Sequence, residues 1–244
     1  LNLVFTMAYK AGVNFGDTKI GQFVSKEFDT EFLKEKGLTM TPNGSKFKID
    51  KQGFLPAMMQ QLYDDRTTYK KKMLHAKQQF EDTKNSEYLN DVSRYNNIQM
   101  ARKISLNSAY GAIGNEWFRY FDLAIAEGVT TAGQLSIRWI ERKLNDYLNN
   151  LLNTDDEDYV IASDTDSVYI CFDNLVNKVF KDPSIDKVVN FLDTVAKEKV
   201  EPYIDECYEE LKQYMNAFSQ KMQMKREVIA DKGIWVAKKR SSLF

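Results

Sequence analysis

The chain of 244 residues is long enough for one large domain or two modest ones, and its formal net charge of −1 excludes a generally basic composition. Two cysteines without Cys-x-x-Cys spacing and a single histidine argue against a disulfide framework, a zinc cluster and a Ser-His-Asp triad. No stretch approaches the roughly 20 apolar residues of a membrane span and no signal-peptide pattern is present, so we expect a cytoplasmic protein without a membrane partner.

The first half of the chain predicts a hairpin followed by two long helices. Pro42-Asn43-Gly44 favours a tight turn between short alternating segments. A helix from Leu55 to about Gln79 is predicted by an apolar stripe made of Leu55, Met58, Met59 and Leu62. After the polar break "EDTKNSEY", a second helix is predicted over roughly 87–113. Two long helices joined by a short polar turn indicate an antiparallel helical hairpin.

The second half predicts a sheet backed by helices. Residues 130–152 form an amphipathic pattern whose buried stripe consists of Leu135, Trp139, Leu144 and Leu148. Next come a strand, a tight turn and a strand in "VIASDTDSVYICF", a helix over about 185–215, and a closing strand pair expected to turn around Lys232-Gly233. The predicted fold class is therefore α+β, an antiparallel sheet backed by helices with an inserted antiparallel two-helix hairpin.

Asp164 and Asp166 interrupt an otherwise apolar run, where burial of carboxylates is costly unless a cation pairs with them. Side chains at i and i+2 share one face of a strand and can converge at a tight turn. Mg²⁺ prefers oxygen ligands and commonly keeps substrate phosphates in its shell. The pair therefore indicates a phosphate-bound metal site. The alternative is an exposed turn whose aspartates cap backbone amides.

The segment "KISLNSAYG" places a cation, an amide, an aromatic ring and a glycine on one helix face. These residues are Lys103, Asn107, Tyr110 and Gly111. Such a face can bind a polar ligand. The alternative is an ordinary exposed helix face that ends in a glycine C-cap.

The segment "DDRTTYKKK" places Arg66 and Lys70 at i and i+4 on the preceding helix, so that both can reach one anion. A planar guanidinium combined with an ammonium group suits a polyphosphate. The alternative is a solvated, lysine-rich face.

Together these motifs resemble those of family B DNA polymerases, most closely the replicative polymerases of large tailed bacteriophages. The family's K-x-x-x-N-S-x-Y-G motif is matched in full by Lys103, Asn107, Ser108, Tyr110 and Gly111. Its Y-G-D-T-D-S motif is matched from the first aspartate onward, with Ala162-Ser163 in place of Tyr-Gly. The family's R-x-x-x-K corresponds to Arg66 and Lys70.

Two further correspondences lie near the end of the chain. The K-K-R-Y motif is matched by Lys238, Lys239 and Arg240, with Ser241 where tyrosine is expected. Glu227 resembles the family's acidic residue near the metals. Order and spacing agree over about residues 38–240, whereas residues 1 to about 28 fit the family poorly.

The resemblance implies template-directed transfer of deoxynucleotides from dNTP to a primer 3′-hydroxyl, with two Mg²⁺ ions for which Mn²⁺ can substitute. It implies metal binding by Asp164 and Asp166, with Glu227 nearby, and a catalytic role for Lys103. It further implies dNTP contacts from the cationic and polar residues of both helices, and DNA contacts from the K-K-R motif. The implied domains are 1–54 as a partial palm-side segment, 55–115 as fingers and 116–244 as palm, truncated before the thumb.

The family's other catalytic aspartate lies in D-x-x-S-L-Y-P-S, which residues 1–54 lack, and Asp17 is not followed by that pattern. Both ends look cut, so we expect a polymerase fragment that is inactive alone. The implied partners are primer-template DNA, dNTP, the remainder of the polymerase and a sliding clamp, in the host cytoplasm if the chain is phage-encoded. The alternatives are a non-catalytic nucleotide or nucleic-acid binder and, less well supported, an Asp-x-Asp glycosyltransferase that binds a metal and a sugar nucleotide.

Overall fold

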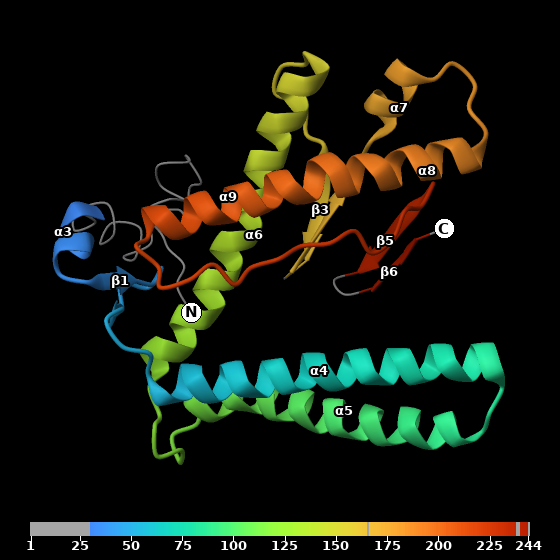
Figure 1. Ribbon diagram of the computed structural model, residues 1–244. Coiled ribbons are helices and arrows are strands. Elements are labelled where there is room, and N and C mark those ends of the chain that lie inside the picture. Colours follow the sequence, from blue (N-terminus) through green and yellow to red (C-terminus); the bar gives the residue numbers. More distant parts are fainter. Residues whose placement is uncertain (1–29, 165, 238–239, 244) are drawn as a thin grey trace. The chain divides into compact units, whose positions relative to one another are not determined.

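The computed structural model describes residues 30–164, 166–237 and 240–243 (Figure 1). These residues fall into two compact units. One contains the described residues up to Lys48 together with those from Gly128 onward, and the other contains Ile49–Glu127. Helices and antiparallel strands are both present, which confirms the α+β class. The assignment of 55–115 and 116–244 to fingers and palm stays a prediction.

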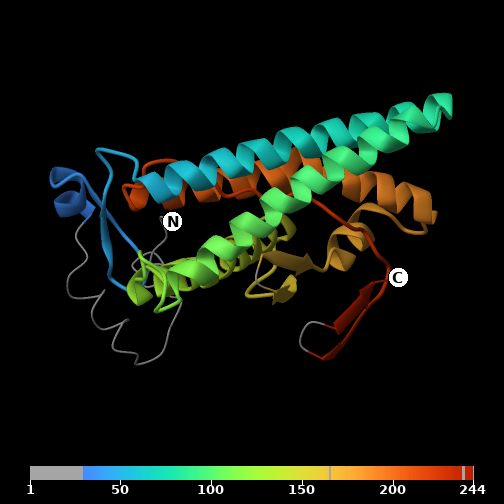
Figure 2. The same ribbon diagram turned by 90° about the horizontal axis from the view of Figure 1, so that it is seen from below.

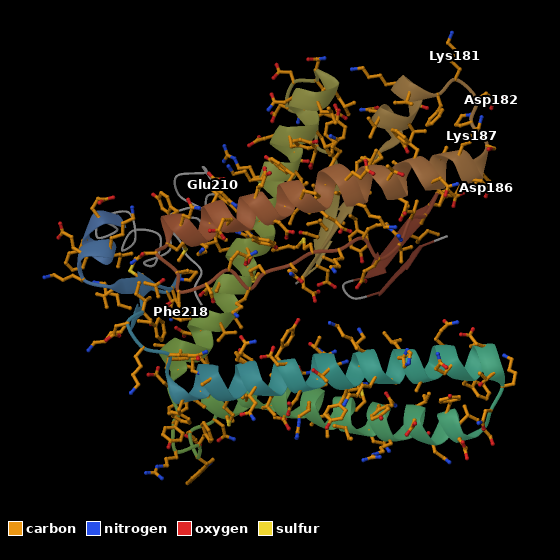
Figure 3. All side chains as sticks on the ribbon, in the orientation of Figure 1. Lys181, Asp182, Asp186, Lys187, Glu210 and Phe218 are labelled. Carbon is orange, nitrogen blue, oxygen red and sulfur yellow. The ribbon has the colours of Figure 1, made fainter. Side chains whose placement is uncertain are left out.

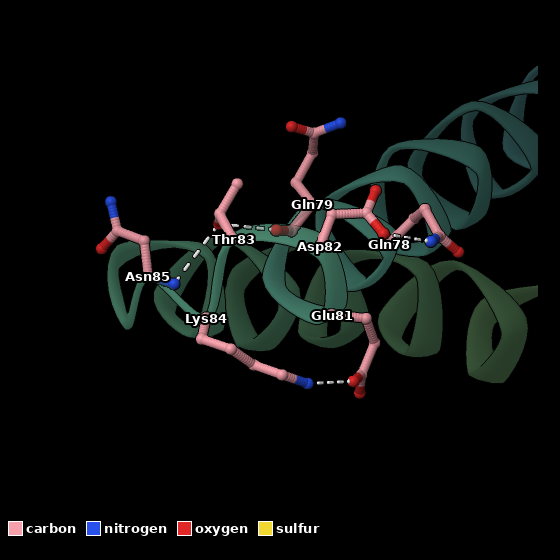
Figure 4. Close-up of polar contacts among 7 residues, drawn as sticks. All are labelled: Gln78, Gln79, Glu81, Asp82, Thr83, Lys84 and Asn85. Carbon is pink, nitrogen blue, oxygen red and sulfur yellow. Dashed lines mark hydrogen bonds and ion pairs between the residues drawn. The ribbon is translucent and has the colours of Figure 1, made fainter.

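The unit Ile49–Glu127 is built on two long helices, α4 (Phe54–Thr83) and α5 (Glu87–Ile113). They pack against each other and run antiparallel, as the apolar stripe and the polar break predicted, and Figure 2 shows them diverging away from the turn that joins them. The turn between them follows Lys84, whose φ of 55° is left-handed and whose N–H donates to the Phe80 carbonyl at 2.7 Å. Close by, the Thr83 hydroxyl donates to the Gln79 carbonyl at 2.7 Å (Figure 4). Both contacts satisfy carbonyls that a helix end leaves without partners.

The other unit is built around α6 (Leu123–Leu152), whose first residues belong to the two-helix unit. The predicted buried stripe of α6 is confirmed, because Leu135, Trp139, Leu144 and Leu148 are all at most 5% exposed. The helical run predicted near 185–215 is also confirmed. It consists of α8 (Ile185–Val195), the π-helical η1 (Ala196–Val200) and α9 (Glu201–Tyr214).

A single core cluster holds α6 against α9. The Trp139 indole N–H donates to the Cys207 carbonyl at 3.2 Å, and the Lys143 ammonium forms a 2.8 Å ion pair with Glu210, whose side chain is labelled on α9 in Figure 3. The buried members of the cluster are Ala132, Leu135, Trp139, Ile140, Leu144, Val160, Val200, Ile204, Cys207, Tyr208, Leu211 and Met215. Because Val160 is among them, the base of the following strand is anchored in the same core.

The described strands form three separate antiparallel pairs. β1 (Leu38–Met40) pairs with β2 (Lys46–Lys48), as the Pro-Asn-Gly turn predicted. β3 (Val160–Asp164) pairs with β4 (Ser167–Ile170), and β5 (Gly233–Ala237) pairs with β6 (Arg240–Leu243). In the part of the chain described, these pairs are not joined, so a single palm sheet stays a prediction.

The turn predicted at Lys232-Gly233 is wrong. Gly233 is instead the first residue of β5 and pairs with Leu243. The segment before it forms no strand and contacts helices through Arg226. The Arg226 N–H donates to the Glu201 side chain at 2.9 Å, and the Arg226 guanidinium forms an ion pair with Asp193.

A short helix, α7 (Asp173–Val179), leads from β4 toward α8. The connection between α7 and α8 and the first turn of α8 carry charges of both signs. Their labelled side chains are all exposed (Figure 3): Lys181 and Asp182 in the connection, and Asp186 and Lys187 in α8. Within the described ranges, no helix is both long enough and apolar enough to cross a bilayer.

Candidate functional site

Asp164 and Asp166 lie at the tip of the β3–β4 hairpin. Asp164 is the last residue of β3 and pairs with Ser167, whose hydroxyl donates to the Asp164 carbonyl at 3.2 Å. The Asp166 N–H also donates to the Asp164 carbonyl, which closes the turn. Both aspartates are exposed. The tip is thus exposed, because only the base of the hairpin enters the core.

The two carboxylates at this tip could supply some, but not all, of the ligands of a hard cation. Two carboxylates supply oxygen ligands, and a cation such as Mg²⁺ can complete its shell with water and phosphate oxygens. Glu227 is exposed in the segment between α9 and β5. No group of three or more His, Cys, Asp or Glu residues able to hold a metal occurs among the described residues. The described structure therefore does not bring Glu227 together with Asp164 and Asp166 in such a group.

The predicted binding face of α5 is exposed. Lys103, Asn107, Tyr110 and Gly111 are all exposed on this helix. Gly111 lies inside the helix and Gly114 is the C-cap, so the reading of Gly111 as a C-cap is wrong. A Cβ at Gly111 would meet no atom within 4 Å. The packing of the helix therefore does not require a glycine here, and the bare backbone is accessible to a ligand.

On α4, Lys70 is exposed and Arg66 is half-buried. The Arg66 Nε atom is buried and has no hydrogen-bond partner among the described residues. An ionised donor in such a position is costly unless an anion or another acceptor binds it. This observation supports an anionic ligand for Arg66.

An ion pair joins the two helices next to these residues. The Arg102 Nε atom lies 3.2 Å from the Asp65 carboxylate, and the side chains are 40% and 39% exposed. Arg102 precedes Lys103, and Asp65 precedes Arg66. The pair thus links the two segments that carry the predicted phosphate-binding residues. Its members are a common charge pair, and nothing in the sequence distinguished them from other charges on these helices.

The predicted DNA-binding motif is described only in part. Lys238 and Lys239 lie outside the described residues, and Arg240 is the first residue of β6, paired with Ala237.

The predicted metal-binding and dNTP-binding residues form two groups. Asp164 and Asp166 belong to the unit built around α6, and the residues of α4 and α5 belong to the two-helix unit.

Two asparagines on α6 were missed in the sequence. Asn145 accepts the backbone N–H groups of Tyr159 and Val160, each at 2.9 Å, and Asn149 bonds the backbone of Glu157 through both its amide nitrogen and its oxygen. They lie at i and i+4, and asparagine is a weak helix former. Its repeated use on one helix face was a usable signal.

Comparison with known proteins assigns the family. Residues 17–243 match the family described as DNA polymerase family B. The chain is 35% identical over 256 residues to the DNA-directed DNA polymerase of Enterobacteria phage T4, covering 83% of this chain and 28% of that protein. It is 45% identical over 157 residues to the DNA-directed DNA polymerase of Escherichia phage RB69, covering 59% of this chain and 17% of that protein.

A eukaryotic relative, the DNA polymerase delta catalytic subunit of Candida albicans, is 32% identical over 142 residues, covering 57% of this chain and 13% of that protein. The chain belongs to the family B DNA polymerases, and the resemblance seen in its motifs is confirmed. The chain spans 28% or less of the length of these three relatives.

Proposed function

We propose that this chain supplies the dNTP-binding helices and two metal-binding aspartates of a DNA-directed DNA polymerase. The reaction is transfer of a deoxynucleotide from dNTP to a primer 3′-hydroxyl, directed by a template. The observation that carries the proposal is the exposed Asp164–Asp166 tip in a chain whose residues 17–243 match this family.

Asp164 and Asp166 would hold Mg²⁺, or Mn²⁺ in its place, with Glu227 as a further candidate ligand. The bound metal lowers the energy of the charge that develops on the attacking and leaving oxygens. Aspartates at a solvent-facing tip avoid the desolvation cost that carboxylates have in a buried site.

The two-helix unit acts as the fingers. Arg66, Lys70 and Lys103 neutralise the triphosphate, and its negative charge becomes more localised on the leaving pyrophosphate as the reaction proceeds. Asn107 positions the phosphates, while Tyr110 and Gly111 lie against the new base pair, where the lack of a glycine side chain lets the base approach closely. Lys238, Lys239 and Arg240 grip the DNA backbone without reading sequence.

Residues 55–115 are then the fingers, 116–244 the palm and 1–54 a palm-side segment. The 244 residues contain no D-x-x-S-L-Y-P-S motif. We therefore expect synthesis to require the remainder of the polymerase, in cis or in trans, and the complete enzyme to work with a sliding clamp. A non-catalytic nucleotide binder is the second candidate, because the described residues do not form a three-carboxylate metal group.

The test is primer extension by this chain supplemented with an N-terminal polymerase segment that carries D-x-x-S-L-Y-P-S. Restored synthesis supports the polymerase, and dNTP binding without synthesis supports the second candidate. Asp164→Ala should then lower the rate by several orders of magnitude, since it removes a metal ligand. Asp186→Ala, at an exposed aspartate on α8, is the matched control. A loss below about tenfold would remove Asp164 from the catalytic residues, and robust extension by the chain alone would contradict the need for a supplied motif.

A second variant tests the fingers assignment. Lys103→Ala should raise the KM for dNTP by about tenfold or more with a smaller change in kcat, because a charge-assisted phosphate contact is lost. Arg94→Ala changes another exposed cation on α5 and should leave both constants unchanged. Equal effects of the two variants would reduce the role of Lys103 to general positive charge.

A further inference from the structure

Asn145 binds the point where the chain enters β3. Its Oδ1 accepts the N–H groups of both Tyr159 and Val160 at 2.9 Å, and its Nδ2 donates to the Asp158 carboxylate at 2.8 Å. Successive N–H groups of a regular strand point to opposite sides. Their convergence on one oxygen therefore shows that Asn145 bends the chain at the first residue of the strand.

The bend is followed by an irregularity in the β3–β4 ladder. Val160 pairs with Ile170, but the next pair is Ala162 with Tyr169, so Ile161 is an extra residue. Ile161 is 54% exposed, whereas Val160 is 4% exposed and belongs to the core cluster. This arrangement is a β-bulge, which leaves one residue unpaired and needs compensation from outside the ladder. Asn145 binds the two backbone N–H groups directly before the unpaired residue and so holds the chain where it enters the bulge.

The bulge determines the register in which β3 and β4 pair at the tip of the hairpin. A regular ladder could form if Ile161 replaced Val160 in the core, or if Ala162–Asp164 slipped by one residue along β4. The first change would exchange a buried side chain for an exposed one. The second would take Asp164 out of its pair with Ser167 and turn its side chain to the other face, because side chains alternate along a strand.

We propose that Asn145 is a positioning residue for the metal-binding tip: by holding the bulged entry of β3 it keeps the carboxylates of Asp164 and Asp166 on a common side of the hairpin. This role rests on the proposed function of the two aspartates. Asn145 touches neither of them and acts only through the backbone of β3.

The neighbouring carboxylate allows a matched rescue. Asn145→Ala removes all three hydrogen bonds. Asn145→Asp keeps the acceptor oxygen but places a second carboxylate beside Asp158. The exchange Asn145→Asp with Asp158→Asn restores an acceptor for both backbone N–H groups and a donor–acceptor contact between the two side chains, at unchanged net charge. Thr154→Val is the control, because the Thr154 hydroxyl contacts the side chains of Tyr159 and Asn149, at 2.8 and 2.7 Å, and not the backbone of β3.

Two readouts on the 244-residue chain test the role. Hydrogen exchange, measured by mass spectrometry on peptides covering 159–170, should be at least tenfold faster in Asn145→Ala. Mn²⁺ affinity, measured by electron paramagnetic resonance, should fall at least threefold. Asn145→Asp should be intermediate, the double exchange should return both values to within twofold of the unchanged chain, and Thr154→Val should stay within twofold.

If Asn145→Ala leaves the hydrogen-exchange rate or the Mn²⁺ affinity unchanged, the role is overturned. It is also overturned if the double variant Asn145→Asp with Asp158→Asn folds but restores neither value. Asp164→Ala separates this result from the proposed function. If Asp164→Ala leaves Mn²⁺ binding and reconstituted primer extension intact, the proposed function fails. Exchange at 159–170 still decides whether Asn145 holds the strand.

Discussion

Leu144→Ala should strongly destabilise the unit that carries the β3–β4 hairpin. Leu144 is 1% exposed in the same core cluster as Val160, the first residue of β3. Losing three side-chain carbons at about 0.8 kcal/mol each removes roughly 2.4 kcal/mol of burial free energy. The cavity left behind raises the expected loss in free energy of unfolding to about 2–5 kcal/mol.

Leu151→Ala is the matched control on the same helix. Leu151 is 47% exposed, so only about half of its burial energy is at stake, and alanine is a slightly better helix former. We expect a loss below about 1 kcal/mol. Urea unfolding followed by circular dichroism measures both values, provided that the slope m is unchanged between variants. A loss below about 1 kcal/mol for Leu144→Ala, or equal losses for the two leucines, would refute the packing described for α6.

Two other predictions concern single contacts. A double-mutant cycle on Asp65 and Arg102 should give a coupling free energy of about 0.5 kcal/mol that weakens with salt, because both side chains are more than a third exposed. A coupling free energy of zero at low salt would show that the pair does not hold the two helices together. At pH 8 a thiol reagent should modify Cys171 but not Cys207. Cys207 is 3% exposed, and burial raises the pKa of its thiol to about 11. Rapid modification of both thiols in the folded chain would contradict this prediction. Because Cys207 keeps its proton longer in the folded state, its contribution to stability should be present below the ordinary thiol pKa of about 8.5 and be lost as pH rises toward 11. The slope of stability against pH should therefore be smaller in Cys207→Ala.

The helices were predictable because their signals are local. The apolar stripe of the first helix and the polar break after it were sufficient to expect a second helix over roughly 87–113, where the structure has α5. The Pro42-Asn43-Gly44 turn was predictable for the same reason, since Gly44 adopts a φ of +85° that other residues avoid. The motifs that indicated family B are likewise short runs whose spacing can be read directly.

The error at Lys232-Gly233 shows where local signals fail. A glycine beside a lysine favours a turn equally well at either end of a strand. The contacts of the preceding segment are not local. Arg226 contacts Asp193 on α8 and Glu201 on α9, residues 25 or more positions earlier in the chain. The sequence likewise left the exposure of Asp164 and Asp166 open, because an apolar run does not show how much of a hairpin lies inside the core.

The chain's own patterns were thus enough to place its helices, its α+β class and its family, because each depends on residues a few positions apart. Tertiary contacts decided the rest of what the structure describes. Asn145 reaches residues 14 and 15 positions away to bend the entry of β3, and core packing buries Val160 while Ile161 stays exposed. Such choices follow from side chains that meet only after the chain has folded, and they determine which way the two aspartates face.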